Sequence, residues 1–237
     1  MKAGRLIKRG MMLSLFQSVV SRRWWLAGAC VLGLAGCAGR VAPEVQKLPE
    51  RVELNGVAVF RGEAYQSGPV ALASMLSQQG VAITPGLLDK PLRLPGAEAQ
   101  LEQNMQGLAR EYGLMVYPLD RQLSALLTQV AAGYPVMVRF TEGSAFWSGP
   151  RYAVLSGYNR TKQTVLLRSG MNRHLLMDFS SFESSWKDAG GWAVLVLSPR
   201  QLPARVDSQR WLKAAGELAQ AGQDQAATTA TKTLNNR

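Results

Sequence analysis

The feature that most constrains the fold is an apolar run at residues 67–79 that carries the start and stop signals of a helix. Ser67 is a helix-capping residue type, Pro69 falls in the first turn, where a missing N–H costs nothing, and Gly80 follows as a stop. The side chains between these signals are too apolar for a surface helix: Val70, Leu72, Ala73, Met75 and Leu76. We therefore expect a buried helix capped by Ser67, whose start offers unpaired N–H groups and the positive end of a dipole.

The hydrophobic periodicity beyond this helix is first helical and then typical of strands. An extended segment is expected at 51–60, and further helices near 84–88, at 98–112 and from Asp120 to Gly133. A short helical turn is expected from Ser180, and strands at 135–140, 152–158, 165–168, 175–179 and 192–197. A helical half followed by an antiparallel sheet half predicts the α+β class.

The last part of the chain, residues 201–237, has an alanine-rich composition. Two amphipathic helical patterns, at 204–221 and 224–234, are joined at Gly222. The pair resembles a single tetratricopeptide unit, whose small residues let two helices approach each other. One such unit cannot bury its apolar face alone, so it must dock on the domain or on a partner, or fray. A solvated helix pair is as good an interpretation as a recognition module.

The first 37 residues have the three parts of a secretory signal: a basic start, an apolar stretch over 24–34 and small residues before Cys37. The apolar stretch is roughly half as long as a membrane-spanning helix requires. Leu34-Ala35-Gly36-Cys37 resembles the lipobox of bacterial lipoproteins. That resemblance implies cleavage before Cys37 and acylation of its thiol and its new amino terminus. A plain signal peptide or an uncleaved anchor is the alternative.

The residues that follow Cys37 bear on location and organisation. Ala38 and Gly39, with no Asp, resemble the pattern that sorts lipoproteins to the outer membrane. We therefore expect a lipid-anchored protein of the bacterial cell envelope that faces the periplasm, with the bilayer as a partner. Residues 38–50 are interpreted as a tether and residues 51–200 as the folded domain.

Charge and composition exclude several classes of site. The six basic residues and the absence of acidic ones in residues 1–36 account for +6 of the formal +11, which leaves +5. Since no stripe of Lys or Arg is interleaved with aromatic residues, nucleic acid is not an expected partner. Both cysteines, Cys30 and Cys37, lie in the leader, and His174 is the sole histidine. We therefore expect no disulfide, metal or cofactor in the domain, and no Cys/His catalysis.

Two stretches resemble the papain-like cysteine peptidases of the bacteriocin-processing (double-glycine) type. The first matches the helix that carries the nucleophilic cysteine: Tyr65-Gln66-Ser67-Gly68-Pro69-Val70-Ala71-Leu72-Ala73. The second matches the strand that carries the catalytic histidine: Arg151-Tyr152-Ala153-Val154-Leu155-Ser156-Gly157-Tyr158. The resemblance covers about 57–197 and implies a papain-like fold in which this helix start and this strand meet at a cleft.

Other residue types occupy the catalytic positions of that family. Ser67 stands at the cysteine position, Arg151 at the histidine position and Ser169 near the position of the group that orients the base. No Gln stands near Gly62 to bind the oxyanion, apart from Gln66 beside the serine. Serine is a weak nucleophile without a base, and a guanidinium stays protonated at neutral pH. We therefore expect no catalytic residues, with Ser67, Arg151 and Ser169 as degenerate positions.

His174 is the alternative base, and a Ser67–His174 pair would make a residual hydrolase. It lies beside Leu175 and Leu176 on or near a later strand. A sole histidine in such a place is more often a surface or capping residue than a base.

Ligand binding is the expected use of the cleft. Arg151 could hold a carboxylate with its planar fork, or form a salt bridge to Glu63 or Glu142. We assign ligand-binding roles to Ser67, Arg151, Tyr152 and Trp147, although aromatic residues in this region are more often core.

The expected function is that of an envelope lipoprotein with a catalytically degenerate cysteine-peptidase-like domain that binds a peptide or protein partner. A residual peptidase or other hydrolase and a purely structural envelope protein are the alternatives.

Overall fold

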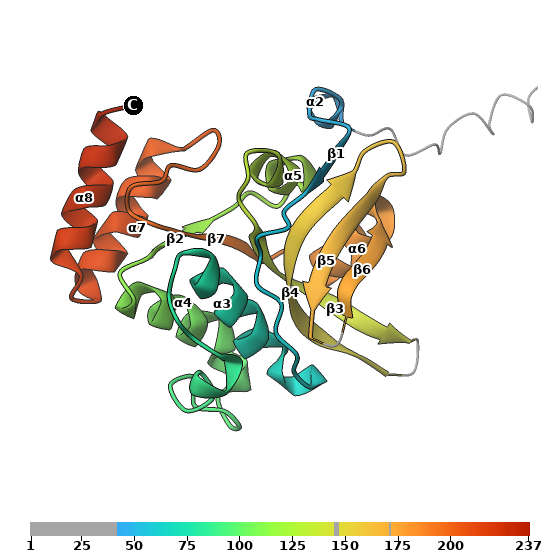
Figure 1. Cartoon of the computed structure of the whole chain (residues 1–237), viewed down its shortest axis with the longest axis horizontal. Coiled ribbons are helices and arrows are strands. Elements are labelled where there is room, and N and C mark those ends of the chain that lie inside the picture. The colour runs from blue at the N-terminus through green and yellow to red at the C-terminus, as the bar shows by residue number, and fades with distance from the viewer. Residues whose placement is uncertain (1–41, 145–146, 171) are drawn as a thin grey trace, which may run out of the picture. The chain divides into compact units, whose positions relative to one another are not determined.

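A computed structural model of the chain describes residues 42–144, 147–170 and 172–237 (Figure 1). The leader with Cys37 and the start of the tether lie outside the described residues. The helical elements are α2 (Pro43–Gln46), η1 (Ala64–Gln66), α3 (Ser67–Gln78), η2 (Pro85–Leu87), η3 (Glu98–Gln100), α4 (Leu101–Glu111), α5 (Leu123–Ala131), α6 (Phe179–Asp188), α7 (Ser208–Gln220) and α8 (Asp224–Asn235). The strands are β1 (Arg51–Glu53), β2 (Met115–Pro118), β3 (Val136–Ser144), β4 (Trp147–Asn159), β5 (Thr164–Ser169), β6 (Asn172–Asp178) and β7 (Ala193–Leu197). Within these residues no helix is both long and apolar enough to span a bilayer.

The strands form one antiparallel sheet in the order β2-β7-β3-β4-β5-β6, and β1 pairs with β4. β4 is the longest strand, and it pairs with β3 along its first part and with β5 along its second. In this register Arg139 lies opposite Tyr152, and Phe140 lies opposite Arg151. The helical half followed by an antiparallel sheet confirms the predicted α+β class.

The two faces of the sheet belong to two hydrophobic cores, because side chains alternate along each strand. On β3, Val136 and Val138 lie in the core that includes α5, α6 and α7, whereas Met137 lies in the core built around α3 and α4. On β4, Leu155 belongs to the first core and Val154 to the second. Figure 1 shows α3 and α4 together beside the strands that they cover.

The start of α3 is packed closely against its neighbours, which explains why it carries small residues. All residues from Ser67 to Leu76 are buried. A Cβ on Gly68 would lie 2.9 Å from Leu101 Cδ2, and a Cβ on Gly62 would lie 2.5 Å from Val70 Cγ2. Glycine at both places therefore allows α4 and the preceding loop to approach α3 closely.

Three local predictions were wrong. Ser67 is the first helical residue and not the cap, since the 3₁₀ turn η1 continues directly into α3 and Gln66 takes the cap position. The helix expected from Asp120 begins at Leu123, with Gln122 and not Asp120 at its cap position. The segment 51–60 is a strand only at Arg51–Glu53, where β4 supplies a hydrogen-bonding partner.

The C-terminal helices dock on the domain, which answers the question that the sequence left open. Trp211 of α7 is fully buried, its Nε1–H donates to the carbonyl of Ala230 at 2.8 Å, and its ring lies 6.2 Å from that of Tyr117 on β2. An ion pair joins Arg110 of α4 to Glu217 of α7. The apolar side of the helix pair is therefore covered by this chain itself.

Candidate functional site

The start of α3 meets β4 through a direct hydrogen bond. The backbone N–H of Tyr152 donates to Ser67 Oγ at 3.2 Å. Ser67 is only 5% exposed, and no other hydrogen bond of its hydroxyl to a described residue is present. The two stretches that carry the family resemblance therefore meet as the resemblance implied, and the hydroxyl at the cysteine position is used as an acceptor.

A cleft of about 710 Å³ opens at this junction. Ser67, Arg151 and Tyr152 line it together, so the structure brings three of the four expected ligand-binding residues into one site. The other polar lining residues are Tyr65, Asp89, Glu98, Glu102 and Arg139, and the apolar ones are Leu94, Pro95, Ala99, Leu101 and Pro150. The cleft therefore combines charges of both signs with apolar surface, a composition typical of sites that bind molecules by several contacts.

The wall formed by the sheet carries a fixed polar network. Arg139 Nη1 donates to Glu102 Oε1 at 3.0 Å, which ties β3 to α4 across the cleft floor. The hydroxyl of Tyr152 lies close enough to the same carboxylate for Glu102 to act on its pKa. Burial, reinforced by the charge and hydrogen bond of Glu102, raises the pKa of Tyr152 to about 12, although the charge of Arg139 acts in the opposite direction. Tyr152 is thus a neutral hydrogen-bond donor throughout the physiological range.

Arg151, at the position of the catalytic histidine, is held by an acid of the neighbouring strand. Its Nε lies 3.8 Å from Glu142 Oε2, and its Nη1 donates to the carbonyl of Pro150 at 3.3 Å. Of the two salt-bridge partners considered from the sequence, the structure places Glu142 beside it. Both side chains are about one-third exposed, so the pair is loose and a ligand anion can compete for the guanidinium.

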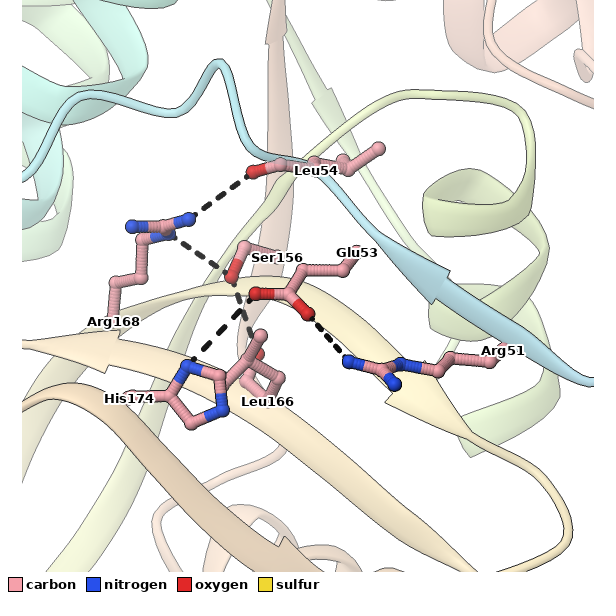
Figure 2. A network of polar contacts seen from close by, with 7 residues as sticks. All are labelled: Arg51, Glu53, Leu54, Ser156, Leu166, Arg168 and His174. Carbon is pink, nitrogen blue, oxygen red and sulfur yellow. Dashed lines mark hydrogen bonds and ion pairs between the residues drawn. The ribbon is translucent and has the colours of Figure 1, made fainter.

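The sole histidine lies elsewhere. His174 is on β6, which is separated from β4 by β5, and its Nδ1 lies 3.9 Å from Glu53 Oε1. Figure 2 shows this imidazole beside Glu53, which Arg51 also holds at 3.0 Å. His174 lines a separate pocket of about 120 Å³ that does not include Ser67. The structure therefore does not bring the Ser67–His174 pair together.

The remaining positions of the catalytic set also contribute no proton-transfer group. Ser169 is buried at the end of β5 and does not line the cleft. Its neighbour Arg168 is turned toward Ser156 Oγ and the carbonyl of Leu54, at 3.3 Å each (Figure 2). The side-chain oxygen of Gln66 accepts from the backbone N–H of Glu63 at 3.2 Å. The fourth expected ligand-binding residue, Trp147, has a side chain outside the described part of the structure.

Sequence reasoning missed the residues that complete the cleft: Asp89, Glu98, Glu102 and Arg139. They lie in a loop, a 3₁₀ turn, a helix and a strand, with no motif in common. The one available signal was the alternation along β3, where Arg139 interrupts a run of apolar residues and so indicates a polar partner. That partner, Glu102, is 37 positions away and is found only through the fold.

The described residues place no imidazole beside the Ser67 hydroxyl. A serine nucleophile needs an acceptor for its proton, and the group at the base position is a guanidinium that accepts none. Removing the base or the nucleophile from a catalytic triad costs roughly six powers of ten in rate. Among the described residues no group of three or more His, Cys, Asp or Glu side chains is placed to hold a metal ion.

No family model and no curated protein matches the sequence of this chain. Among solved structures, the chain is similar to a putative C39-like peptidase from Bacillus anthracis, with a TM-score of 0.49 and 15% identity over 63% of this chain and 98% of that one. It is similar to xylellain, a cysteine protease from Xylella fastidiosa, with a TM-score of 0.49 and 10% identity over 66% and 88% of the two chains. It is also similar to a double glycine motif protease from an AMS/PCAT transporter, with a TM-score of 0.44 and 15% identity over 65% and 95%.

These similarities concern architecture alone, and at such identities and TM-scores they carry no argument about chemistry. The first is described as C39-like and the third as a double glycine motif protease, the type of peptidase that residues 57–197 resemble, and xylellain is described as a cysteine protease.

Proposed function

We propose that this chain is an envelope lipoprotein whose peptidase-like domain binds a peptide, or a segment of a partner protein, without cleaving it. One observation carries the proposal. The serine at the start of α3 and the arginine at the base position line one cleft of about 710 Å³, in which no imidazole approaches the hydroxyl.

Three features of the cleft support a peptide as the ligand. Its walls offer hydrogen-bond donors and acceptors to the backbone of a bound peptide, including the neutral hydroxyl of Tyr152. Arg151 is held loosely by Glu142 and can receive a carboxylate in its fork. Apolar lining residues such as Leu94 and Leu101 provide contact area for side chains.

A selection from a random nonapeptide phage library on the purified protein tests the proposal. We expect enriched peptides whose synthetic versions bind the protein and are recovered intact after prolonged incubation. Ala99→Trp places a large ring on the exposed cleft wall and should abolish binding, whereas Ala132→Trp, on the exposed end of α5, should not.

Two results would decide for the alternatives. Hydrolysis of the peptides that disappears in Ser67→Ala, together with labelling of Ser67 by a serine-reactive phosphonate, would establish a residual hydrolase. Failure to enrich any peptide over the Ala99→Trp protein would favour a structural role.

The lipoprotein part of the proposal rests on the sequence of the leader. Leu34-Ala35-Gly36-Cys37 supplies the acylation signal, and Ala38-Gly39 supplies the outer-membrane signal. An anchored domain of this kind would present its cleft to ligands in the periplasm.

A further inference from the structure

The wall opposite the sheet contains an acid with a buried oxygen that nothing in the described structure satisfies. Asp89 lines the cleft, and its Oδ1 is buried without a hydrogen-bond partner. The neighbouring cations Lys90 and Arg93 form no ion pair with it among the described residues. Buried carboxylate oxygens are almost always paired, so an unpaired one in the wall of a cleft indicates a missing hydrogen-bond donor, which a cationic group of a ligand can supply.

The other two acids of the cleft are already engaged. Glu102 accepts a hydrogen bond from Arg139 at 3.0 Å. Both oxygens of Glu98 accept from the backbone N–H of Gly96 at 3.0 Å, and this bond lowers the pKa of Glu98. Among the acids of the cleft, Asp89 is thus the one with a buried oxygen that lacks a partner, and the exposed carboxylate of Glu98 adds negative charge to the same wall.

The surroundings of Asp89 suit a long cationic side chain. Leu94, Pro95 and Ala99 line the same wall, and apolar surface of this kind packs against the methylene stem of a lysine or arginine. The wall is held in place before any ligand arrives. Leu88 and Leu92 are fully buried, the N–H of Leu94 donates to the carbonyl of Asp89 at 3.0 Å, and Asn104 of α4 donates to the carbonyl of Leu92 at 3.3 Å.

We propose that Asp89 is the recognition site for a lysine or arginine side chain of the bound peptide, so that the cleft selects basic peptides. This inference rests on the proposed function, since it names the ligand of the same cleft. The basic residue contacts Asp89 on the helical wall, while Arg151 on the sheet wall remains available to a carboxylate of the same peptide. The two charges fix the direction in which the peptide lies.

The peptides enriched in the phage selection provide the test. We expect a lysine or arginine at one fixed position, and replacement of that residue by norleucine should weaken binding to the wild-type protein about tenfold or more, as expected for a charged hydrogen bond. In Asp89→Asn the basic and norleucine peptides should bind equally, within about twofold. Asp188→Asn, an exposed acid on α6 away from the cleft, should behave as the wild type.

The loss of binding preference in Asp89→Asn can be interpreted if this variant is as stable as the wild type. Because Oδ1 has no partner in the free protein, Asp89→Asn should not lower the melting temperature. Asp89→Ala, measured in parallel, should show the same loss of preference.

The possible outcomes separate the two proposals. Peptides that bind and are blocked by Ala99→Trp, but that show no basic position or keep their preference in Asp89→Asn, overturn the Asp89 site and leave peptide binding intact. If no peptide is enriched at all, both proposals fall.

Discussion

Tyr152 connects the elements around the cleft through three different parts of one residue. Its N–H donates to Ser67 of α3, its hydroxyl interacts electrostatically with Glu102 of α4, and its ring meets that of Trp192 edge-on at 5.7 Å. A residue with these contacts positions both walls of the cleft. Changes to it should therefore alter stability as well as binding.

The hydroxyl of Tyr152 makes a prediction about pH. Tyr152→Phe removes the polar interaction of this hydroxyl with Glu102 and should lower the free energy of unfolding by about 1 kcal/mol at pH 8. In the wild type the folded pKa, about 12, lies above the ordinary value of 10.0, so the unfolded chain loses its proton first as pH rises. The contribution of Tyr152 to the free energy of unfolding is therefore complete below pH 10 and is lost between about pH 10 and 12.

Urea unfolding at pH 8, 9, 10 and 11 would measure this effect. The stability gap between wild type and Tyr152→Phe should narrow above pH 10, whereas Tyr65→Phe, at an exposed position, should follow the wild type throughout. A gap that stays constant across this range would show that the Tyr152 hydroxyl is not protected by burial.

At the scale of elements, the C-terminal helix pair is attached through α7. Trp211 of α7 packs against α8 and β2, and its indole N–H donates to the carbonyl of Ala230 in α8. Additional polar links run from Arg210 to Asp120 and from the N–H of Asp207 to the Tyr117 hydroxyl. The pair is therefore a part of the domain's packing and not an appended arm.

Substitution of Trp211 tests how much the helix pair contributes to stability. Trp211→Ala should cost roughly 3–5 kcal/mol, because it removes the largest side chain of this contact. Trp211→Phe keeps most of the packing and should cost less. Leu212→Ala, at the exposed neighbouring position, is the control. Urea denaturation is the measurement, and unfolding is monitored by circular dichroism because that signal does not depend on tryptophan fluorescence. Equal losses for Trp211→Ala and Leu212→Ala would contradict the docking role.

At the scale of the whole molecule, the proposed function joins a binding cleft to a membrane anchor in one chain. An acylated amino-terminal cysteine would hold the protein at the bilayer, since each buried methylene contributes about 0.8 kcal/mol and stable anchoring takes more than one chain. The cleft would then sample ligands near the membrane surface without diffusing away.

The two cysteines of the leader allow a matched test of the anchor. Cys37→Ser should abolish incorporation of labelled palmitate and remove the protein from the membrane fraction of cells. Cys30→Ser, seven residues earlier, should leave palmitate incorporation and membrane association unchanged. Membrane association that survives Cys37→Ser without palmitate would indicate an uncleaved leader as the anchor.

Local patterns were sufficient for much of the fold and for part of the site. Hydrophobic periodicity predicted α3, α4 and the strands from β3 to β7, because burying one face or both faces of an element leaves a repeat in the sequence. Short-range signals were less reliable at the ends of helices. Ser67 and Asp120 both have capping chemistry, yet neighbouring turns placed the caps at Gln66 and Gln122.

What the sequence determined by itself is the class of fold, because hydrophobic periodicity depends on which residues are present and in what order. What only the tertiary structure decided is which charges share the cleft. Arg139, Glu102 and Asp89 are far apart in the chain and carry no common motif, and the folding of α4 and its preceding loop against β3 and β4 brings them together. The same packing separates His174 from Ser67, because β5 lies between β4, which contacts Ser67, and β6, which carries the imidazole.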